Sequence, residues 1–358
     1  MMRHMHTGQK TVFVGLSGGV DSSVAALRLQ REGYNVVGVF IKVWHPDFMV
    51  CNWEQERLDA MRVAAHLEIP FLTCDAEAEY RDEVAHSFIE EYKAGRTPNP
   101  DVLCNQHVKF GAFLRFAKAK GADLIATGHY AQRVPGETDF ELHRGVDTQK
   151  DQTYFLWTLT QEQLRSTLFP VGDTPKDEIR AEAQAAAIPT AAKKDSQGIC
   201  FLGHVDIPEF LSHYIDLTPG NVRNEAGAVI GQHKGAFVYT IGQRHGFTLH
   251  TTDQHRPAMF VLEKDIHNNT ITVGPKEHVV QNNQAITLHS TQLRQPVEIG
   301  EQILAQVRYR QTPFLVTVAE LSDGRVTVTP TERREPAAIG QSCVLYRGEN
   351  CLGGGIIK

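Results

Sequence analysis

Residues 11–23 read TVFVGLSGGVDSS, and this stretch decides the expected fold of the N-terminal half of the chain. An apolar, largely β-branched run ends at Gly15, a serine- and glycine-rich turn follows, and an amphipathic segment runs from Asp21 to Gln30. This order predicts a buried strand, a tight loop and the start of a helix. Gly18 and Gly19 let backbone N–H groups approach an anion, and the helix dipole favours negative charge there. We therefore expect the loop to bind phosphate.

The residues of this loop allow two interpretations. An ordinary strand-to-helix turn capped by Ser17, Asp21 or Ser22 could contain the same glycine pair. The loop contains neither the Walker A pattern nor G-x-G-x-x-G. SGGVDSS (residues 17–23) instead resembles the PP-loop of the ATP pyrophosphatases, which split ATP between its α and β phosphates. This resemblance implies a nucleotide site and favours the second interpretation.

Strands and helices alternate along the rest of this region. The patterns predict strands over 35–42, 70–73 and 122–127, and helices over 54–67, 76–93 and 105–120. Such alternation is typical of a parallel sheet covered on both faces, which binds its ligands beyond the carboxyl ends of the strands. The two prolines of RTPNPDVLC (96–104) predict an extended loop that excludes helix.

The character of the sequence changes near Pro219. Glycines recur without a visible βαβ unit, and short alternating strands follow from about Asn269. These strands predict a small antiparallel barrel or sandwich. We expect an α/β fold with three domains: a parallel-sheet domain over 1–203, a small central domain over 204–275 and an antiparallel β-barrel over 276–358.

The composition is that of a globular protein with several domains. The chain has 358 residues, of which 41% are hydrophobic and 22% charged. Its net charge of -6 gives no overall basic surface for nucleic acid, so any RNA contact must come from local clusters such as 193–194, 308–310 and 333–334. The N-terminus lacks an apolar signal region, and no stretch is long enough to span a membrane. We expect a cytoplasmic protein without a membrane partner.

The six cysteines form no C-x-x-C pair and no zinc-ligand pattern, so no metal site is expected from them. In a reducing compartment they are free thiols rather than a disulfide framework. Cys104 and Cys200 lie in loop-like segments with lysines nearby, and positive charge lowers the pKa of a thiol. Their spacing alone favours two unrelated buried cysteines over a catalytic pair.

Seven further blocks of sequence change that balance. They read GRTPNPDVLCN (95–105), ATGHY (126–130), KDQTYFL (150–156), KKDSQGICF (193–201), TIGQRHG (240–246), RYRQ (308–311) and CLGGGII (351–357). Together with SGGVDSS, they resemble, in order and along the whole chain, the signature blocks of the tRNA-specific 2-thiouridylases of the MnmA family. The resemblance implies ATP-dependent 2-thiolation of the wobble uridine in tRNAs for lysine, glutamate and glutamine. ATP would be cleaved to AMP and pyrophosphate.

The resemblance also implies roles for individual residues. Sulfur would be carried as a persulfide on Cys200, with Cys104 as the second catalytic cysteine and Asp101 as an acid or base. ATP, with Mg²⁺, would contact Gly15, Leu16, Ser17, Gly18, Gly19, Val20, Asp21, Ser22, Ile41 and Gly128. The tRNA would contact Asn99, Pro100, Asp101, His129, Lys150, Asp151, Gln152, Arg308, Tyr309 and Gln341. A sulfur-relay protein or a cysteine desulfurase would donate the sulfur.

The sequence departs from the family pattern at Ile41, where a methionine is usual, and at Gln197 in the cysteine block. Neither change removes a reactive group. Three other interpretations stay open: a PP-loop ligase acting on a small molecule, of the argininosuccinate- or NAD-synthetase type; an RNA-binding module with ATP as a structural ligand; and an iron–sulfur cluster held by Asp101, Cys104 and Cys200.

Overall fold

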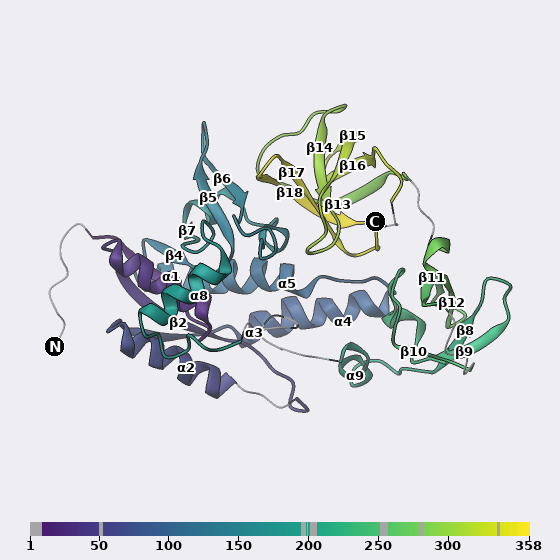
Figure 1. The fold of residues 1–358 in the computed structure, drawn as a ribbon, viewed down its shortest axis with the longest axis horizontal. Coiled ribbons are helices and arrows are strands. Elements are labelled where there is room, and N and C mark those ends of the chain that lie inside the picture. The colour runs from purple at the N-terminus through teal and green to yellow at the C-terminus, as the bar shows by residue number, and fades with distance from the viewer. Residues whose placement is uncertain are drawn as a thin grey trace.

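The computed structural model describes residues 9–49, 53–194, 198, 200, 206–250, 257–279, 283–334 and 337–358. Cys51 and most of the block around Cys200, including Gln197, lie outside these residues. Figure 1 shows three regions that follow one another along the chain: an α/β region, a central β region and a C-terminal barrel. No helix in the described ranges is long and apolar enough to cross a membrane.

The α/β region is built on a five-stranded parallel sheet. Its order is β3-β2-β1-β4-β7, and every neighbouring pair is parallel. The strands are β1 (Thr11–Gly15), β2 (Asn35–Lys42), β3 (Phe71–Asp75), β4 (Leu124–Ala126) and β7 (Thr167–Leu168). The predicted parallel sheet is thereby confirmed.

Successive residues of β1 and β2 point to opposite faces of this sheet, and each face is buried. Val12 and Val14 pack with α1 (Val20–Arg31), α2 (Trp53–His66) and α8 (Lys176–Ala185). Phe13 packs on the other face with a helical stretch over 77–119. That stretch comprises α3 (Glu77–Glu79), the π-helix η1 (Tyr80–Ala85), α4 (His86–Lys93), α5 (Pro100–Leu103), the π-helix η2 (Cys104–Ala112) and α6 (Phe113–Ala119).

The segment RTPNPDVLC differs from its prediction. Pro100 does not exclude helix but starts α5 as its first residue, where its missing N–H group has no helical partner to lose. The Asn99 side chain caps this helix by accepting a hydrogen bond from the Val102 N–H group at 3.4 Å. Within this segment only residues 96–99 lie outside helix, and the helix continues directly into Cys104.

The central region is a second five-stranded sheet of order β10-β9-β8-β12-β11, in which only β8 and β12 are parallel. Figure 1 shows α4 extending from the α/β region to this sheet, where Phe88 and Tyr92 of α4 join its core. The elements are α9 (Ile207–Ser212), β8 (Gly220–Arg223), β9 (Val229–His233), η4 (Ala236–Val238), β10 (Phe247–Leu249), β11 (Met259–Asp265), β12 (Thr270–Pro275) and η5 (Lys276–His278).

The C-terminal strands form the predicted barrel, because the antiparallel series β13-β16-β15-β14-β17-β18 closes through a β13–β18 pairing. They are β13 (Ile286–Leu293), β14 (Gln302–Gln306), β15 (Phe314–Ser322), β16 (Arg325–Pro330), β17 (Ser342–Arg347) and β18 (Asn350–Ile357).

A hairpin from the α/β region joins the barrel sheet. It consists of β5 (Ala131–Pro135) and β6 (Phe140–Arg144), and Asn350 of β18 pairs with His143 of β6. Nearby lie η3 (Thr153–Phe155) and α7 (Gln161–Arg165). Val344 and Tyr346 of the barrel belong to the same buried core as the second face of the parallel sheet. The α/β region and the barrel therefore share one core.

Candidate active site

The loop between β1 and α1 ends at a helix whose first turn is not capped by a side chain. Gly19 is the N-cap residue of α1, and no side-chain cap bond is formed there. The Ser22 and Ser23 hydroxyls instead donate back to the Gly19 carbonyl, at 3.2 and 2.7 Å. The side-chain-capped turn is therefore not what the chain forms. The N–H groups at this helix start remain suited to an anion.

Gly18 needs its lack of a side chain, because its φ is +70° and it lies against α2. A Cβ atom at this position would be 2.8 Å from Cβ of Asp59. Gly128, at the end of β4, is equally tight, since its Cβ would lie 2.7 Å from the Ser22 nitrogen. The predicted nucleotide residues of β1, α1 and β4 thus meet at one end of the parallel sheet.

Several predicted ATP-contacting residues have little exposed surface, and two of them are apolar residues of the sheet core. Leu16 is 1% exposed and Ile41 6% exposed, and each packs in the core of the sheet. A contact between Leu16 and a nucleotide would therefore involve its backbone.

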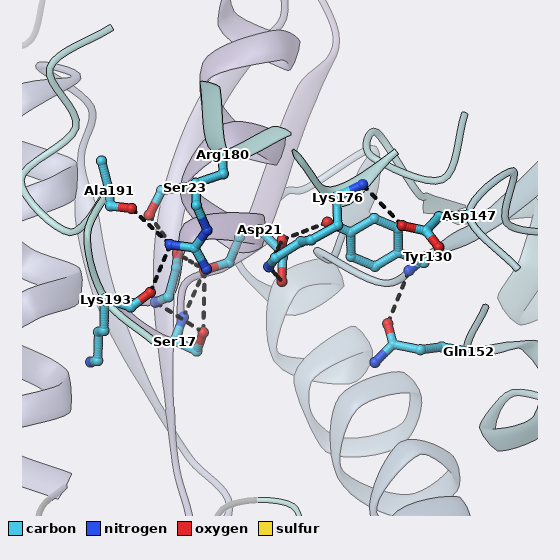
Figure 2. Close-up of polar contacts among 12 residues, drawn as sticks. Ser17, Asp21, Ser23, Tyr130, Asp147, Gln152, Lys176, Arg180, Ala191 and Lys193 are labelled. Atoms are coloured by element: carbon cyan, nitrogen blue, oxygen red, sulfur yellow. Dashed lines mark hydrogen bonds and ion pairs between the residues drawn. The ribbon is translucent and has the colours of Figure 1, made fainter. Parts of the chain in front are cut away.

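Asp21, in the first turn of α1, is surrounded by donors that the sequence did not single out (Figure 2). The Lys176 ammonium group contacts its two carboxylate oxygens at 2.7 and 2.9 Å, and the Tyr130 hydroxyl donates to it at 2.8 Å. Gln152, a predicted tRNA contact, accepts a hydrogen bond from the Tyr130 N–H group at 3.0 Å. Its amide therefore supports the nucleotide side of the site.

The chain that leads to Cys200 is fastened to the helices around the loop. The Arg180 guanidinium of α8 donates to the carbonyls of Ala191 and Lys193 at 2.9 and 3.0 Å (Figure 2). The Lys193 ammonium group pairs with Asp59 of α2 at 2.9 Å. Lys193, expected beside the thiols or RNA, thus helps to anchor this segment.

Cys104 and Cys200, 96 positions apart in the sequence, lie side by side. The Cys104 thiol donates to the Cys200 sulfur at an Sγ–Sγ distance of 3.5 Å, and both are free cysteines. Cys104 is fully buried at the start of η2, whereas Cys200 is half-buried. Two contacts hold the Cys200 backbone: its N–H group donates to Asp101 at 2.8 Å, and its carbonyl accepts from the Tyr80 hydroxyl at 3.0 Å.

The two thiols differ in ionisation. The hydrogen bond from Cys104 lowers the pKa of Cys200, and the Lys109 charge adds to this effect against the opposing effect of burial. Burial, together with the neighbouring Cys200, raises the pKa of Cys104 well above its ordinary value. Burial also raises the pKa of Asp101, with the Cys200 N–H group and Lys109 opposing it. Cys200 is therefore the more readily ionised thiol of the pair.

Lys109 faces the thiols because of the π-helical winding of η2. Residues five apart in an α-helix lie about 140° apart around the axis, whereas i→i+5 hydrogen bonding brings them close to one face. Burial lowers the pKa of Lys109, but the neighbouring Cys200 acts in the opposite direction and the net pKa is raised. Lys109 is therefore a cation.

His129 lies behind this lysine. Its Nε2 atom is 3.4 Å from the Lys109 ammonium nitrogen, and its Nδ1 atom is 2.8 Å from the Thr127 hydroxyl. The ring is only 7% exposed, and burial followed by the Lys109 charge holds the pKa of His129 well below its usual range. The structure places this predicted tRNA contact as a neutral ring beside the thiol site.

Several other predicted tRNA contacts also make contacts within the protein. Gln341 of the barrel donates to the carbonyls of Thr97 and Pro98, at 2.9 and 3.0 Å, and so supports the segment that leads to Asn99 and Pro100. Asp151 accepts hydrogen bonds from the N–H groups of Gly145 and Thr153. The Tyr309 ring packs against Phe155 with centroids 4.5 Å apart. Arg308 and Lys150 are half-buried.

The donor set does not favour a metal cluster. Within the described ranges, no group of three His, Cys, Asp or Glu side chains is placed to hold a metal ion. Asp101, the third ligand that a cluster on this cysteine pair would need, directs an oxygen to the Cys200 N–H group. The arrangement fits thiol chemistry better than an iron–sulfur centre.

The chain matches three family models in succession. They are a tRNA methyl transferase HUP domain over residues 10–204, a tRNA methyl transferase PRC-barrel domain over 208–275 and an aminomethyltransferase beta-barrel domain over 283–357. Among solved structures, a 4-thiouridine synthetase–RNA complex with bound ATP is 19% identical with a TM-score of 0.34, covering 57% of this chain and 50% of that chain.

Curated relatives match almost the whole length. A tRNA-specific 2-thiouridylase MnmA of Lysinibacillus sphaericus is 44% identical over 98% of this chain and 94% of its own. The MnmA of Francisella tularensis subsp. holarctica is 45% identical over 97% of this chain and 99% of its own. Matches of this extent, together with the paired cysteines and the loop on β1, show that the chain belongs to the MnmA family of tRNA-specific 2-thiouridylases.

Proposed function

We propose that this protein uses ATP to replace the C2 oxygen of the wobble uridine of tRNA with sulfur. The observation that carries the proposal is the Cys104–Cys200 contact at 3.5 Å, because it joins two segments 96 residues apart at a position with a cation beside it. A small-molecule ligase of the PP-loop type needs no such pair. Membership of the MnmA family supports the same substrate class.

The first half of the reaction makes the C2 oxygen a leaving group. The uridine oxygen attacks the α phosphate of ATP, pyrophosphate departs, and AMP remains on the oxygen. The loop at Gly18 and Gly19 and the N–H groups of the α1 start stabilise the charge that develops on the phosphates. Asp21 is the carboxylate of this loop that could hold Mg²⁺ together with phosphate oxygens, and the ion would shield their charge.

The second half transfers sulfur. The terminal sulfur of a Cys200 persulfide attacks C2 and AMP departs. The Cys104 sulfur, having lost its proton, then attacks Sγ of Cys200 and breaks the sulfur–sulfur bond, so that the transferred sulfur stays on C2. A Cys104–Cys200 disulfide forms, and a reductant restores the thiols. A relay protein or desulfurase supplies each new persulfide sulfur.

The groups around the thiols have separate roles in this scheme. Lys109 stabilises negative charge on Cys200 and on its persulfide, because it is a cation beside them. Asp101 would act as the acid or base of the reaction, which its raised pKa and its contact with the Cys200 N–H group support. Asn99, Pro100 and Asp101 would face the target base after it leaves the stack of the anticodon loop.

The proposal is tested by a single-turnover assay with ATP, Mg²⁺, a persulfide donor and unmodified glutamate tRNA. We expect wild-type protein to give 2-thiouridine, detected by mass after digestion, together with AMP. Cys200→Ser and Cys104→Ser should give none. Cys343→Ala, which alters a buried cysteine of the barrel core, should remain active. Full activity of the two serine variants would contradict the proposal.

Two other results would identify a different function. AMP and pyrophosphate without thiolated RNA would favour the small-molecule ligase. The absence of pyrophosphate with every tRNA, despite RNA binding, would favour an RNA-binding module that holds ATP as a structural ligand.

The barrel side of the tRNA site is tested separately. Arg308→Ala should weaken tRNA binding in a filter assay, because a half-buried cation beside Tyr309 would be lost from the phosphate-contacting surface. Arg325→Ala removes an exposed arginine from the same barrel and is the matched control. Equal binding by the Arg308 variant and wild type would count against this assignment.

A further inference from the structure

The loop that is proposed to receive ATP carries a negative charge of its own. Asp21 lies in the first turn of α1, where the phosphates would bind, and its side chain is 29% exposed. Two like-charged groups repel each other strongly in a partly buried site. The carboxylate therefore needs a neutralising partner before ATP can enter.

Lys176 is that partner, and its position is unusual for a lysine. Its side chain is only 8% exposed. Lysine is seldom buried to this degree unless a charged partner compensates for the loss of water. The ammonium group contacts both oxygens of Asp21, at 2.7 and 2.9 Å. The backbone N–H group of Lys176, at the start of α8, donates to Asp147 at 3.1 Å and fixes the base of the side chain (Figure 2).

Asp21 also has a second donor. The Tyr130 hydroxyl donates to the Oδ1 atom of Asp21 at 2.8 Å, and Tyr130 is itself held through Gln152. The carboxylate would thus keep a hydrogen bond if the ammonium group turned away. The lysine, with four rotatable side-chain bonds, can move its charge by a few ångströms without any change of the backbone.

We propose that Lys176 is a phosphate-binding residue. In the nucleotide-free protein its ammonium group pairs with Asp21, and when ATP binds it moves to a phosphate oxygen. This inference rests on the proposed use of ATP and adds a cation to a loop that lacks the lysine of a Walker A sequence. In this arrangement Asp21 competes with ATP for the ammonium group.

A purely structural ion pair is the alternative, and the two predict opposite results for Asp21. If Lys176 is a phosphate-binding residue, Asp21→Asn frees its ammonium group for ATP. The substitution also removes the repulsion between the Asp21 carboxylate and the phosphates, so ATP binds more tightly. If the pair is structural, Asp21→Asn leaves a buried lysine without its counter-ion and lowers stability, while ATP binding gains nothing. Under this alternative, the double variant that also carries Lys176→Met recovers the stability that each single substitution loses.

The test is equilibrium binding of ATP in EDTA, measured by calorimetry, with thermal melting of each variant. We expect Lys176→Met to weaken binding by about tenfold or more, since a charge-assisted contact is lost. We expect Asp21→Asn to tighten it by a few-fold or more, and the double variant to bind more weakly than Asp21→Asn alone. Lys93→Met, which breaks the exposed Lys93–Glu90 pair at 2.8 Å, is the control and should bind ATP normally.

Three outcomes would overturn the inference: unchanged ATP binding by Lys176→Met, weaker binding by Asp21→Asn, or a double variant that binds ATP as tightly as Asp21→Asn alone. Lys176→Gln, of similar size, replaces Lys176→Met if the latter melts early. Binding is read without tRNA or sulfur, so failure here leaves the thiolation assay untouched. If the wild type bound no ATP with or without Mg²⁺, this inference and the proposed function would fall together.

Discussion

At the scale of single residues, the site depends on how each thiol changes the ionisation of the other. Cys104 donates its proton toward Cys200 and keeps it, because its own sulfur is fully buried. Cys200, whose pKa is lowered, lies at the more accessible position, which the proposed sulfur donor and the target uridine would have to reach. This asymmetry supports the proposal that Cys200, and not Cys104, carries the persulfide.

This asymmetry predicts the pH dependence of thiol alkylation. Thiolate is the reactive form, so the rate rises as pH passes through the pKa. Because the pKa of Cys200 is lowered, we expect the midpoint for Cys200 to lie below that of an unperturbed cysteine thiol. Cys104→Ala and Lys109→Met each remove a group that lowers this pKa, so both should move the midpoint upward.

The measurement is iodoacetamide labelling across pH, with the modified cysteine identified by mass spectrometry. Lys118→Met is the control, because Lys118 is exposed on the adjoining α6. An unchanged midpoint in Lys109→Met would show that this lysine does not act on Cys200.

The residues of the site were predictable to different degrees. Cys104 and Cys200 followed from the resemblance, whereas their spacing alone argued for unrelated thiols. Tyr80 and Lys176 carry no local signal, because one looks like a core aromatic and the other like a charge on a solvated helix. Their roles arise from contacts over 120 and 155 positions, to Cys200 and Asp21. Short-range patterns cannot indicate such contacts.

At the scale of elements, the loop between β1 and α1 packs closely against α2. Gly18 has a left-handed φ and no room for a Cβ atom beside Asp59 and the Glu56 carbonyl. Glycine is thus needed here both for its conformation and for its size. The approach of α2 then determines where the loop amides lie.

Gly18→Ala should therefore lower the free energy of unfolding by about 2 kcal/mol or more and impair ATP binding, because strain and overlap act together. Gly33→Ala is the matched control, since Gly33 also has a left-handed φ, of +87°, but nothing lies within 4 Å of its added Cβ. Urea unfolding and calorimetric ATP binding measure the two effects. Equal losses in both variants would show that the contact with α2 is unimportant.

Elements were predictable where hydrophobic periodicity was strong. The strand over 35–42 has the predicted bounds, and the helix over 54–67 is displaced by one residue at each end. The π-helical winding of η2 was not foreseeable, because no residue pattern distinguishes it from an α-helix. Strand β18 was missed since Gly353, Gly354 and Gly355 weaken its strand pattern. Backbone atoms of neighbouring strands occupy the place of a side chain at Gly353 and Gly354, and the Leu288 and Thr291 side chains occupy it at Gly355.

At the scale of the whole molecule, buried polar contacts join the barrel to the α/β region. The Tyr154 hydroxyl donates to the carbonyls of Val307 and Ser342, at distances of 3.1 and 3.0 Å. The Trp157 indole N–H group donates to the Ser342 hydroxyl at 3.0 Å. These contacts lie next to the core that the barrel and the parallel sheet share. We expect the two regions to unfold together.

Tyr154→Phe tests this expectation, because it leaves two buried carbonyls without their shared donor. The free energy of unfolding should fall by about 1–3 kcal/mol. Unfolding of the α/β region and the barrel should still occur in one transition. Tyr34→Phe is the control, since Tyr34 packs against the opposite face of the sheet. Denaturant titration followed by both far- and near-UV circular dichroism measures the effect, and two separate transitions would contradict a shared core.

The shared core has a further consequence for the order in which the protein is made. Thr153 and Tyr346, whose hydroxyls lie 3.3 Å apart, are separated by 193 positions. At roughly 5–20 residues per second, a ribosome needs about 10–40 s to synthesise the intervening chain. During that interval the apolar surface of the nascent α/β region that faces the barrel is uncovered. We expect the α/β region to complete its folding only once the barrel has been synthesised, and a chain that ends before the barrel to expose apolar surface and aggregate.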